Sequence, residues 1–306
     1  MKRVFVVVVL AAVLIVAVSA AAFVHRLDQR THGQYFDSNG VKIHYTVEGA
    51  GPPVILVHGF AVNGDLNWRR PGVIDALSPR YQVITLDNRG HGLSDKPHEA
   101  GKYGIEMVED VIRLMDHLKI PKAHVVGYSM GGFMTLKLLT LHPDRLLSVA
   151  PCAAGWAPPT EKAPVLEALA VSLERRAGFG PLTRTLEPGG NPNWFKVWMT
   201  DRILMHLNDQ AALAQVIRQF PEFTVAEEAL RNNTVPVLSV VGSLDPLKLG
   251  IDRMKGILGA HEVCVIDNCD HITTMRDAGF VQALEDFLDR QTSAAPERAP
   301  APAEAA

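Results

Sequence analysis

Short runs of aliphatic and β-branched residues alternate with longer segments of helical periodicity along most of this chain. Continuous apolar runs bounded by turn residues are typical of strands that are covered on both faces of a mainly parallel sheet. We expect such strands at residues 53–57, 82–86, 124–126, 146–150, 237–241 and 262–266. We expect the helices between them at residues 72–78, 104–118, 130–141, 247–258 and 278–290. Regular alternation of strand and helix predicts a doubly wound α/β fold.

A different pattern precedes the first of these strands. Polar and apolar residues alternate on both sides of Asn39-Gly40, over Tyr35-Phe36 and again over Val41–Tyr45. An Asn-Gly step between two alternating segments is a strong signal for a β-hairpin. The sheet should therefore begin with an antiparallel pair before it becomes parallel.

The alternation of strands and helices is interrupted between residues 152 and 234. Helical stretches at residues 164–176, 194–207 and 209–219 are separated by breaks rich in proline and glycine. An insertion of this length between two strands of one sheet predicts a helical cap folded over the strand ends. A packing appendage without that role is the alternative.

This insertion contains the aromatic residues Trp156, Trp194, Phe195 and Trp198. Together they suggest an apolar pocket beneath the cap. Packing inside the core is the use that we expect for most of them.

The first 24 residues have the composition of a targeting or membrane segment. A basic start, Met1-Lys2-Arg3, is followed by Val4–Val24, in which Ser19 is the only polar residue. Two interpretations remain: a signal peptide cleaved after small residues, or an uncleaved anchor, which needs about 20 apolar residues. Because the basic start favours the inner side of the membrane, both predict export. The folded domain would be periplasmic, secreted, or anchored to the membrane outside the cytoplasm.

The remaining domain boundaries follow from these patterns. We expect a linker at residues 25–32, an α/β core formed by residues 33–151 and 235–291, the cap at residues 152–234, and a disordered tail at residues 292–306. The tail is rich in Ala, Pro and Glu and has little apolar area to bury.

Composition argues against several classes of function. The chain has 306 residues, 47% of them hydrophobic, and a net charge of −3, which does not indicate a nucleic-acid partner. It has no zinc-like Cys/His spacing, no phosphate-binding loop and no dinucleotide-binding glycine motif, so we expect no metal and no cofactor. Three cysteines argue against a disulfide framework. A single bridge between Cys264 and Cys269 stays open, with buried free thiols favoured, and the sequence does not define the oligomeric state.

The strongest candidate for chemistry is the pattern Gly127-Tyr128-Ser129-Met130-Gly131. It follows an apolar strand and precedes an apolar helix, which is the context required for the G-x-S-x-G nucleophile turn. A serine on such a turn has a strained backbone, and the flanking glycines remove side chains that would collide with neighbouring elements. Ser129 is therefore the candidate nucleophile, with an ordinary glycine-rich turn as the alternative.

A serine hydroxyl needs a base, usually a histidine that is oriented by a carboxylate. On this architecture the acid and the histidine follow the serine along the chain. Asp245 and His271 each lie just beyond the carboxyl end of a predicted strand. We therefore assign Asp245 as the acid and His271 as the base, with Asp267 and Asp270 as weaker candidates for the acid.

Acyl transfer also needs hydrogen-bond donors for an oxyanion. One donor normally follows the nucleophile, and the other comes from the loop after the first parallel strand, here His58-Gly59-Phe60. The backbone N–H groups of Phe60 and Met130 are the candidates. We expect His58 to hold the loop by hydrogen bonding rather than to act in catalysis, and Asn63 is a candidate for contact with a small-molecule substrate.

Five motifs occur in an order that resembles the α/β-hydrolase family. They are His58-Gly59-Phe60, Asp87–Asp95, Gly127–Gly132, Gly242–Pro246 and Asp270-His271. The resemblance covers residues 35–291 and implies a mostly parallel eight-stranded sheet, a helical cap and the catalytic roles given above. It also implies that Arg89 and His91, within the second motif, are mainly structural.

The residue at the nucleophile turn limits the reaction. Similar family members that open epoxides or displace halide use Asp at this place, so Ser129 argues against those activities. Serine fits hydrolysis of esters, thioesters or lactones, and we favour small or medium apolar carboxylic esters cleaved through an acyl-enzyme. Hydrolytic C–C cleavage and cofactor-free perhydrolysis by the same three residues are alternatives, as is a ligand-binding protein without chemistry.

Overall fold

The computed structural model describes residues 31, 33–158, 164–187 and 194–293. The expected N-terminal segment at 1–24, nearly all of the expected linker at 25–32 and most of the expected tail lie outside the described residues. Among the residues that are described, no helix is both long enough and apolar enough to cross a bilayer.

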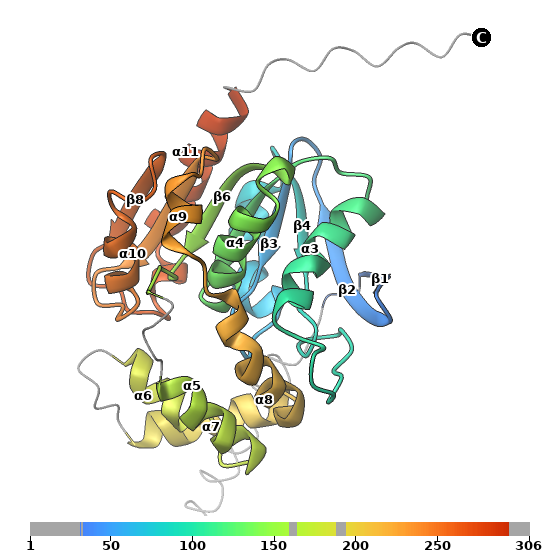
Figure 1. Ribbon diagram of the computed structural model, residues 1–306, viewed down its shortest axis with the longest axis vertical. Helices are drawn as coiled ribbons and strands as arrows, with labels where there is room; N and C mark the ends of the chain where they lie inside the picture. The colour runs from blue at the N-terminus through green and yellow to red at the C-terminus, as the bar shows by residue number, and fades with distance from the viewer. Residues whose placement is uncertain (1–30, 32, 159–163, 188–193, 294–306) are drawn as a thin grey trace, which may run out of the picture.

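An eight-stranded sheet forms the centre of the molecule, as the resemblance implied (Figure 1). Its strands are β1 (Gln34–Ser38), β2 (Val41–Glu48), β3 (Pro53–Val57), β4 (Gln82–Leu86), β5 (Ala123–Tyr128), β6 (Leu146–Cys152), β7 (Val237–Gly242) and β8 (His261–Ile266). Their spatial order is β1-β2-β4-β3-β5-β6-β7-β8. The first two pairs are antiparallel and the later ones are parallel. The predicted doubly wound fold and its opening hairpin are confirmed.

Helices cover both faces of this sheet (Figure 1). One face is covered by α2 (Val73–Leu77) and α11 (Ala278–Ser293), and the other by α3 (Ile105–His117), α4 (Met130–Leu141) and α10 (Lys248–Met254). The side chains of β3 alternate accordingly, with Val54 and Leu56 packed on the first face and Ile55 and Val57 on the second. Burial on both faces explains why this strand has a continuous apolar sequence.

The chain changes its direction of travel across the sheet at β3. From β3 it passes to β4 on one side, and it then returns to β5 on the other side. In open α/β sheets, ligand sites form at such a switch point, beyond the carboxyl ends of the strands. Val57 in β3 is paired with Gly127 in β5, so the loops that follow these two strands start side by side.

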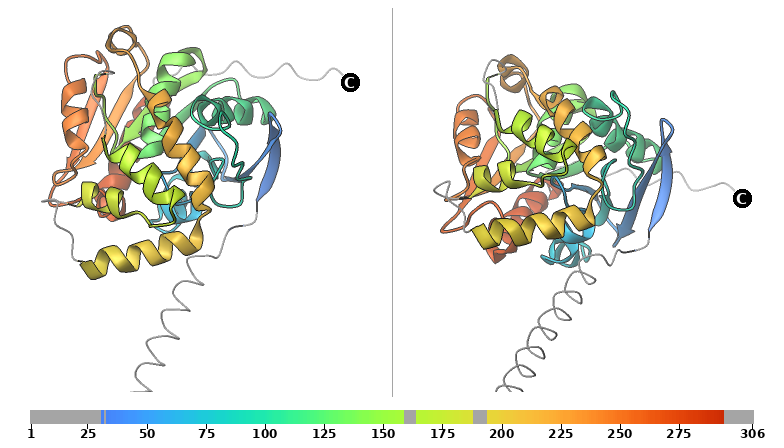
Figure 2. Two further views of the ribbon diagram at one scale, coloured as in Figure 1. Left: turned by 60° about the horizontal axis from the view of Figure 1, so that its bottom comes forward. Right: turned by 90° about the horizontal axis from the view of Figure 1, so that it is seen from below.

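Between β6 and β7 the described chain is helical. It forms α5 (Pro164–Glu174), α6 (Gly180–Leu186), α7 (Trp194–Leu207), α8 (Gln210–Gln219) and α9 (Glu227–Arg231). Figures 1 and 2 show α5 to α8 gathered at one end of the sheet, and α5 packs along α8. His98 Nε2 lies 2.9 Å from Asp209 Oδ2, and this contact links the helical layer to the loop after β4. The sequence pattern did not indicate α6 and α9, which are short.

Two helix boundaries differ from those predicted. The helix expected at residues 247–258 ends at Met254, because the next residue is extended and Gly256 has a φ of 81°, which does not continue a helix. The last helix continues beyond the predicted end to Ser293. The hydroxyls of Thr292 and Ser293 donate to backbone carbonyls one turn earlier, so these two residues are helical rather than part of the tail.

Cys152, Cys264 and Cys269 are all free thiols, which agrees with the favoured interpretation. Cys152 lies at the end of β6 and is fully buried. Burial raises the pKa of the Cys152 thiol to about 12, so it stays protonated and is a poor nucleophile.

Candidate active site

Ser129 lies at a sharp turn between β5 and α4. Its φ of 54° and ψ of −116° lie in a region that residues with a side chain rarely adopt, at a cost of about 1–3 kcal/mol. Glycines allow this turn to be compact. A methyl group on Gly127 would collide with the Gly131 carbonyl oxygen, and one on Gly131 would collide with the Val57 carbonyl oxygen. The turn is therefore confined by backbone atoms of its own helix and of β3.

His271 and Asp245 meet Ser129 at the carboxyl edge of the sheet. His271 Nε2 lies 3.0 Å from Ser129 Oγ, and His271 Nδ1 lies 2.8 Å from Asp245 Oδ2. Because the ionised carboxylate can only accept, His271 donates from Nδ1 and keeps Nε2 as an acceptor for the serine hydroxyl. Asp245 and His271 are each 3% exposed, whereas Ser129 is half-buried. The structure thus brings together the three residues singled out from the sequence.

Hydrogen bonds connect the loops that hold the acid and the base. Asp245 follows β7 and His271 follows the neighbouring strand β8. The Leu244 amide donates to the Cys269 carbonyl oxygen at 3.0 Å, which joins the two loops. The Tyr128 hydroxyl donates to the His271 carbonyl oxygen at 2.6 Å, which ties the base to the nucleophile turn. The sequence does not indicate this role, because Tyr128 has no feature that distinguishes it from a core aromatic residue.

The other two carboxylates considered for the acid lie elsewhere. Asp270 Oδ1 accepts hydrogen bonds from the Ile272 and Thr273 amides at 2.9 and 2.8 Å and closes the turn that contains His271. Asp267 is exposed. Asp245 is the carboxylate that contacts the imidazole.

The loop after β3 packs directly on the nucleophile turn. A methyl group on Gly59 would lie 3.3 Å from the Tyr128 carbonyl oxygen and 3.4 Å from Ser129 Cβ. Within the described chain, neither the Phe60 amide nor the Met130 amide makes a hydrogen bond. Met130 is the first residue of α4, where backbone N–H groups have no partner inside the helix. The two expected oxyanion donors are therefore unused and lie on adjoining segments.

His58 holds this loop, as expected. Its Nδ1–H donates to the Gly59 carbonyl oxygen at 2.7 Å, and its Nε2 accepts from the Asn88 amide at 2.9 Å. Burial lowers the pKa of His58, although Asp87 and the Gly59 carbonyl oppose this shift. The ring is therefore neutral and acts as a donor and an acceptor at the same time.

Asn67 is a further positioning residue that sequence analysis missed. It is 3% exposed, and its Oδ1 accepts from the Gly59 amide at 2.9 Å. Asn63, by contrast, is buried and its Oδ1 accepts from the Leu66 amide at 3.0 Å, in the first turn of η1 (Asp65–Arg69). The Asn63 side chain is therefore bonded within its own loop, and its contact with substrate stays a prediction.

Arg89 and His91 support the loops behind the site, as the resemblance implied. Arg89 is fully buried, and its Nε and one terminal nitrogen lie 2.7 and 2.6 Å from the two carboxylate oxygens of Asp110. The His91 ring packs edge-on against the His58 ring, with 5.2 Å between their centroids. Burial, together with the nearby His58, lowers the pKa of His91 to about 3, so this ring is also neutral.

The helical layer reaches the site at two points. The Phe179 ring lies 6.2 Å from the Phe60 ring, centroid to centroid, and Phe179 is fully buried. Asn208, which follows α7, donates from Nδ2 to the Ala61 carbonyl oxygen at 3.0 Å. An apolar side chain of the layer thus lies beside the loop that carries the Phe60 amide.

The aromatic residues of the insertion divide into two groups. Trp156 is buried, and its indole N–H donates to the Val225 carbonyl oxygen at 3.0 Å, which agrees with core packing. Trp194, Phe195 and Trp198 are exposed on α7. For these three, the expectation of core packing is wrong, and the apolar pocket stays a prediction.

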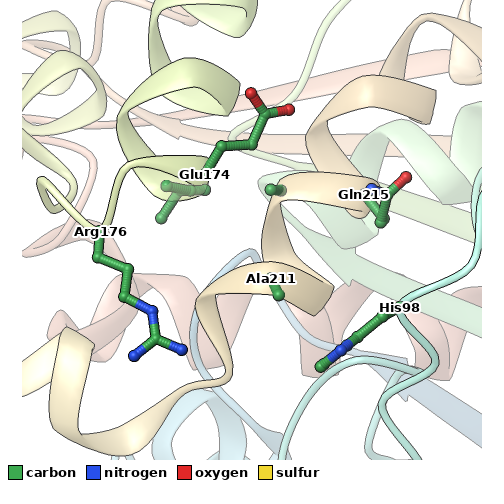
Figure 3. Close-up of a pocket in the computed structure, with 7 residues that line it drawn as sticks. His98, Glu174, Arg176, Ala211 and Gln215 are labelled. Carbon is green, nitrogen blue, oxygen red and sulfur yellow. The ribbon is translucent and has the colours of Figure 1, made fainter.

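An open cavity of about 200 Å³ lies between α5 and α8. Figure 3 shows the side chains that line it. Its walls include His98, Glu174, Arg176 and Gln215. None of Ser129, Asp245 and His271 lines it. This cavity is therefore separate from the reaction centre. In the part of the chain that the structure describes, no group of three or more His, Cys, Asp or Glu side chains could hold a metal ion.

The fold and the site define a class of protein in which a serine on a strand–turn–helix unit meets a histidine and an aspartate from later loops of one sheet. A family model described as "alpha/beta hydrolase fold" matches residues 52–180. With the eight-stranded sheet, this match shows that the chain has the α/β-hydrolase fold.

Relatives with curated descriptions match over part of their length. The dihydrolipoyllysine-residue acetyltransferase component of the acetoin cleaving system from Cupriavidus necator is 42% identical over 119 residues, which cover 38% of this chain and 30% of that protein. An epoxide hydrolase from Caballeronia sordidicola is 37% identical over 37% of this chain and 34% of that protein. The putative carbamate hydrolase RutD from Azorhizobium caulinodans is 34% identical over 40% and 44%. The chain thus spans less than half the length of each of these relatives.

Solved structures resemble the protein over most of its length. A membrane phospholipase A, described as a bacterial virulence factor, has a TM-score of 0.67 at 24% identity and covers 96% of this chain and 100% of its own. The enol-lactonase from Burkholderia xenovorans LB400 has a TM-score of 0.69 at 24% identity and covers 84% and 100%. At these identities the likeness shows the shared fold.

Proposed function

We propose that this protein is a serine hydrolase that cleaves small or medium apolar carboxylic esters through an acyl-enzyme. The observation that carries the proposal is the hydrogen-bonded chain from Ser129 Oγ through His271 to Asp245, with distances of 3.0 and 2.8 Å. A reachable hydroxyl backed by a buried imidazole and a buried carboxylate is the arrangement expected of an activated serine.

In the first step, His271 Nε2 removes the Ser129 proton while Oγ attacks the carbonyl carbon of the ester. The Phe60 and Met130 amides stabilise the negative charge that develops on the carbonyl oxygen. Asp245 stabilises the imidazolium, which then donates its proton to the departing alcohol as the C–O bond breaks. Water that is deprotonated by the same imidazole then attacks the acyl-enzyme, and release of the carboxylic acid restores Ser129.

The surroundings of the two donors support an apolar substrate. The Phe60 and Phe179 rings lie next to each other beside the loop that carries one donor. Serine at position 129 also supports an acyl-enzyme, because the similar family members that open epoxides have Asp at this position. Hydrolytic C–C cleavage and perhydrolysis by the same residues are outcomes that the experiment below distinguishes.

A panel of p-nitrophenyl esters, from the acetate to the dodecanoate, tests the proposal. We expect turnover that is highest for short or medium acyl chains. In Ser129→Ala, kcat should fall by about 10³–10⁶-fold while the fold is retained. Ser293→Ala changes an exposed serine at the end of α11 and is the matched control, with turnover like the wild type.

Two results would contradict this assignment. Ester turnover by Ser129→Ala at the wild-type rate would remove Ser129 from the mechanism. Failure to cleave any ester, combined with cleavage of a vinylogous diketone or formation of a peracid from hydrogen peroxide and a carboxylic acid, would replace the ester hydrolase with one of the alternatives.

A further inference from the structure

The outer side of α7 carries apolar side chains where a surface helix usually has polar ones. Trp194, Phe195, Trp198 and Met199 are 76%, 50%, 52% and 44% exposed. Their i, i+1, i+4 and i+5 spacing places them on one stripe of the helix, and Phe195 stacks on Trp198 with 5.8 Å between ring centroids. We call these four residues the α7 aromatic face. An exposed apolar cluster of this kind marks an interaction surface.

Contacts from the later turns of α7 fix the orientation of this helix. Leu204 and Met205 pack against the core. The Asp201 carboxylate accepts from the Phe179 amide at 2.9 Å. Rotation of α7 to bury its aromatic face would break these contacts, and Figure 2 shows α7 as the outermost helix at its end of the molecule.

The described chain begins close to the point where α7 is attached. Thr31 Oγ1 donates to Asp65 Oδ1 at 2.9 Å, and Asp65 is four residues beyond Ala61, which accepts the hydrogen bond from the residue that follows α7. The apolar run Val4–Val24 ends seven residues before Thr31. Seven residues span at most about 25 Å when fully extended. Anything that binds the apolar run is therefore held near the C-terminal end of α7.

We propose that the α7 aromatic face lies in the headgroup region of a phospholipid bilayer in which Val4–Val24 anchors the chain. Tryptophan is favoured at this depth, because its ring contacts acyl chains while its N–H group remains hydrated. Arg202 is exposed one turn beyond Trp198 and suits lipid phosphate groups. The anchor and α7 then contact one surface, and the second contact sets the orientation of the folded domain. This inference does not depend on the reaction proposed above.

A second copy of the chain is the other partner that could bind an apolar helix face. The size of the face argues against it. The face consists of four exposed apolar side chains, all within the first six residues of α7. A stable protein interface buries about 800 Å² and roughly 20–30 residues on each partner. A bilayer does not require such an area, because the anchor supplies most of the attachment.

Quenching by brominated lipids tests the proposal on the full-length chain. The protein has four tryptophans, of which Trp68 and Trp156 are buried and Trp194 and Trp198 are exposed. The chain is reconstituted into phosphatidylcholine–phosphatidylglycerol vesicles whose acyl chains are either unmodified or brominated near the headgroup. We expect a loss of tryptophan emission in the brominated vesicles. The loss should disappear in the double variant Trp194→Phe and Trp198→Phe and persist in the matched control Trp156→Phe.

Three results would overturn the proposal. The first is equal emission of the wild-type chain in both kinds of vesicle. The second is a full-length chain that stays in the supernatant when the vesicles are sedimented. The third is a fall in acrylamide quenching of Trp194 and Trp198 as the protein concentration is raised at a fixed lipid concentration. Such protection would place a second copy of the chain on the α7 aromatic face.

Discussion

The two halves of the candidate site are held by different kinds of contact. On the nucleophile side, the turn around Ser129 is confined by backbone atoms that leave no room for a side chain at Gly127 or Gly131. On the base side, Asp245 and His271 stand on loops after separate strands and are joined by hydrogen bonds. Steric exclusion therefore defines the nucleophile side. The base side depends on polar contacts between loops together with one close backbone contact, because a methyl group on Gly242 would collide with the Cys269 carbonyl oxygen.

This difference determines how each half responds to substitution. A close-packed turn cannot accept an added atom without moving its neighbours. A hydrogen-bonded loop can lose one partner and keep the fold while the reacting groups lose their alignment. Changes on the base side should therefore lower turnover more than stability, and changes at the turn glycines should lower stability directly.

The largest effect is expected for Asp245→Asn on the base side. The amide no longer selects the imidazole tautomer that leaves Nε2 free to accept, so kcat should fall by about 10⁴-fold. The urea midpoint of unfolding should remain close to that of the wild type. Steady-state kinetics and urea unfolding of one preparation measure both quantities. Asp267→Asn, an exposed carboxylate that follows β8, is the matched control, and unchanged turnover in Asp245→Asn would remove the acid from the site.

A smaller effect, on stability, is expected for Gly131→Ala on the nucleophile side. The new methyl group would collide with the Val57 carbonyl oxygen, and overpacking of this kind lowers the free energy of unfolding by about 1–3 kcal/mol. Gly259→Ala is the matched control, since a methyl group there has nothing within 4 Å. It should change the free energy of unfolding by less than about 0.5 kcal/mol. If Gly131→Ala had the same free energy of unfolding as this control, the proposed difference between the two halves would be contradicted.

The same contrast explains which residues could be predicted from the sequence. The nucleophile turn is encoded in five consecutive residues, because its steric rule appears directly as glycines. Asp245 and His271 could be predicted from strand ends and chain order. Tyr128 and Asn67 could not, because each bonds to a backbone group, of His271 and of Gly59 respectively, whose position no local pattern specifies.

The helical layer was predicted less completely than the sheet. Its longer helices followed from periodicity, but Trp198 and Met205 are seven residues apart on one side of α7, so periodicity alone does not show which of them meets the core. Leu204 and Met205 pack inward, and Trp194 and Trp198 face outward. The exposure of Trp194 and Trp198, which we expected to be buried, leads to the proposed contact with a bilayer.

Activation of Ser129 by His271 and Asp245 is the central claim, and covalent labelling tests it most directly. The wild-type protein is treated with a fluorophosphonate, digested, and mapped by mass spectrometry. The account predicts one modified residue, Ser129, carrying a phosphonyl group on Oγ. A folded protein in which Ser129 stays unmodified, or in which the adduct lies only on another residue, would contradict the account.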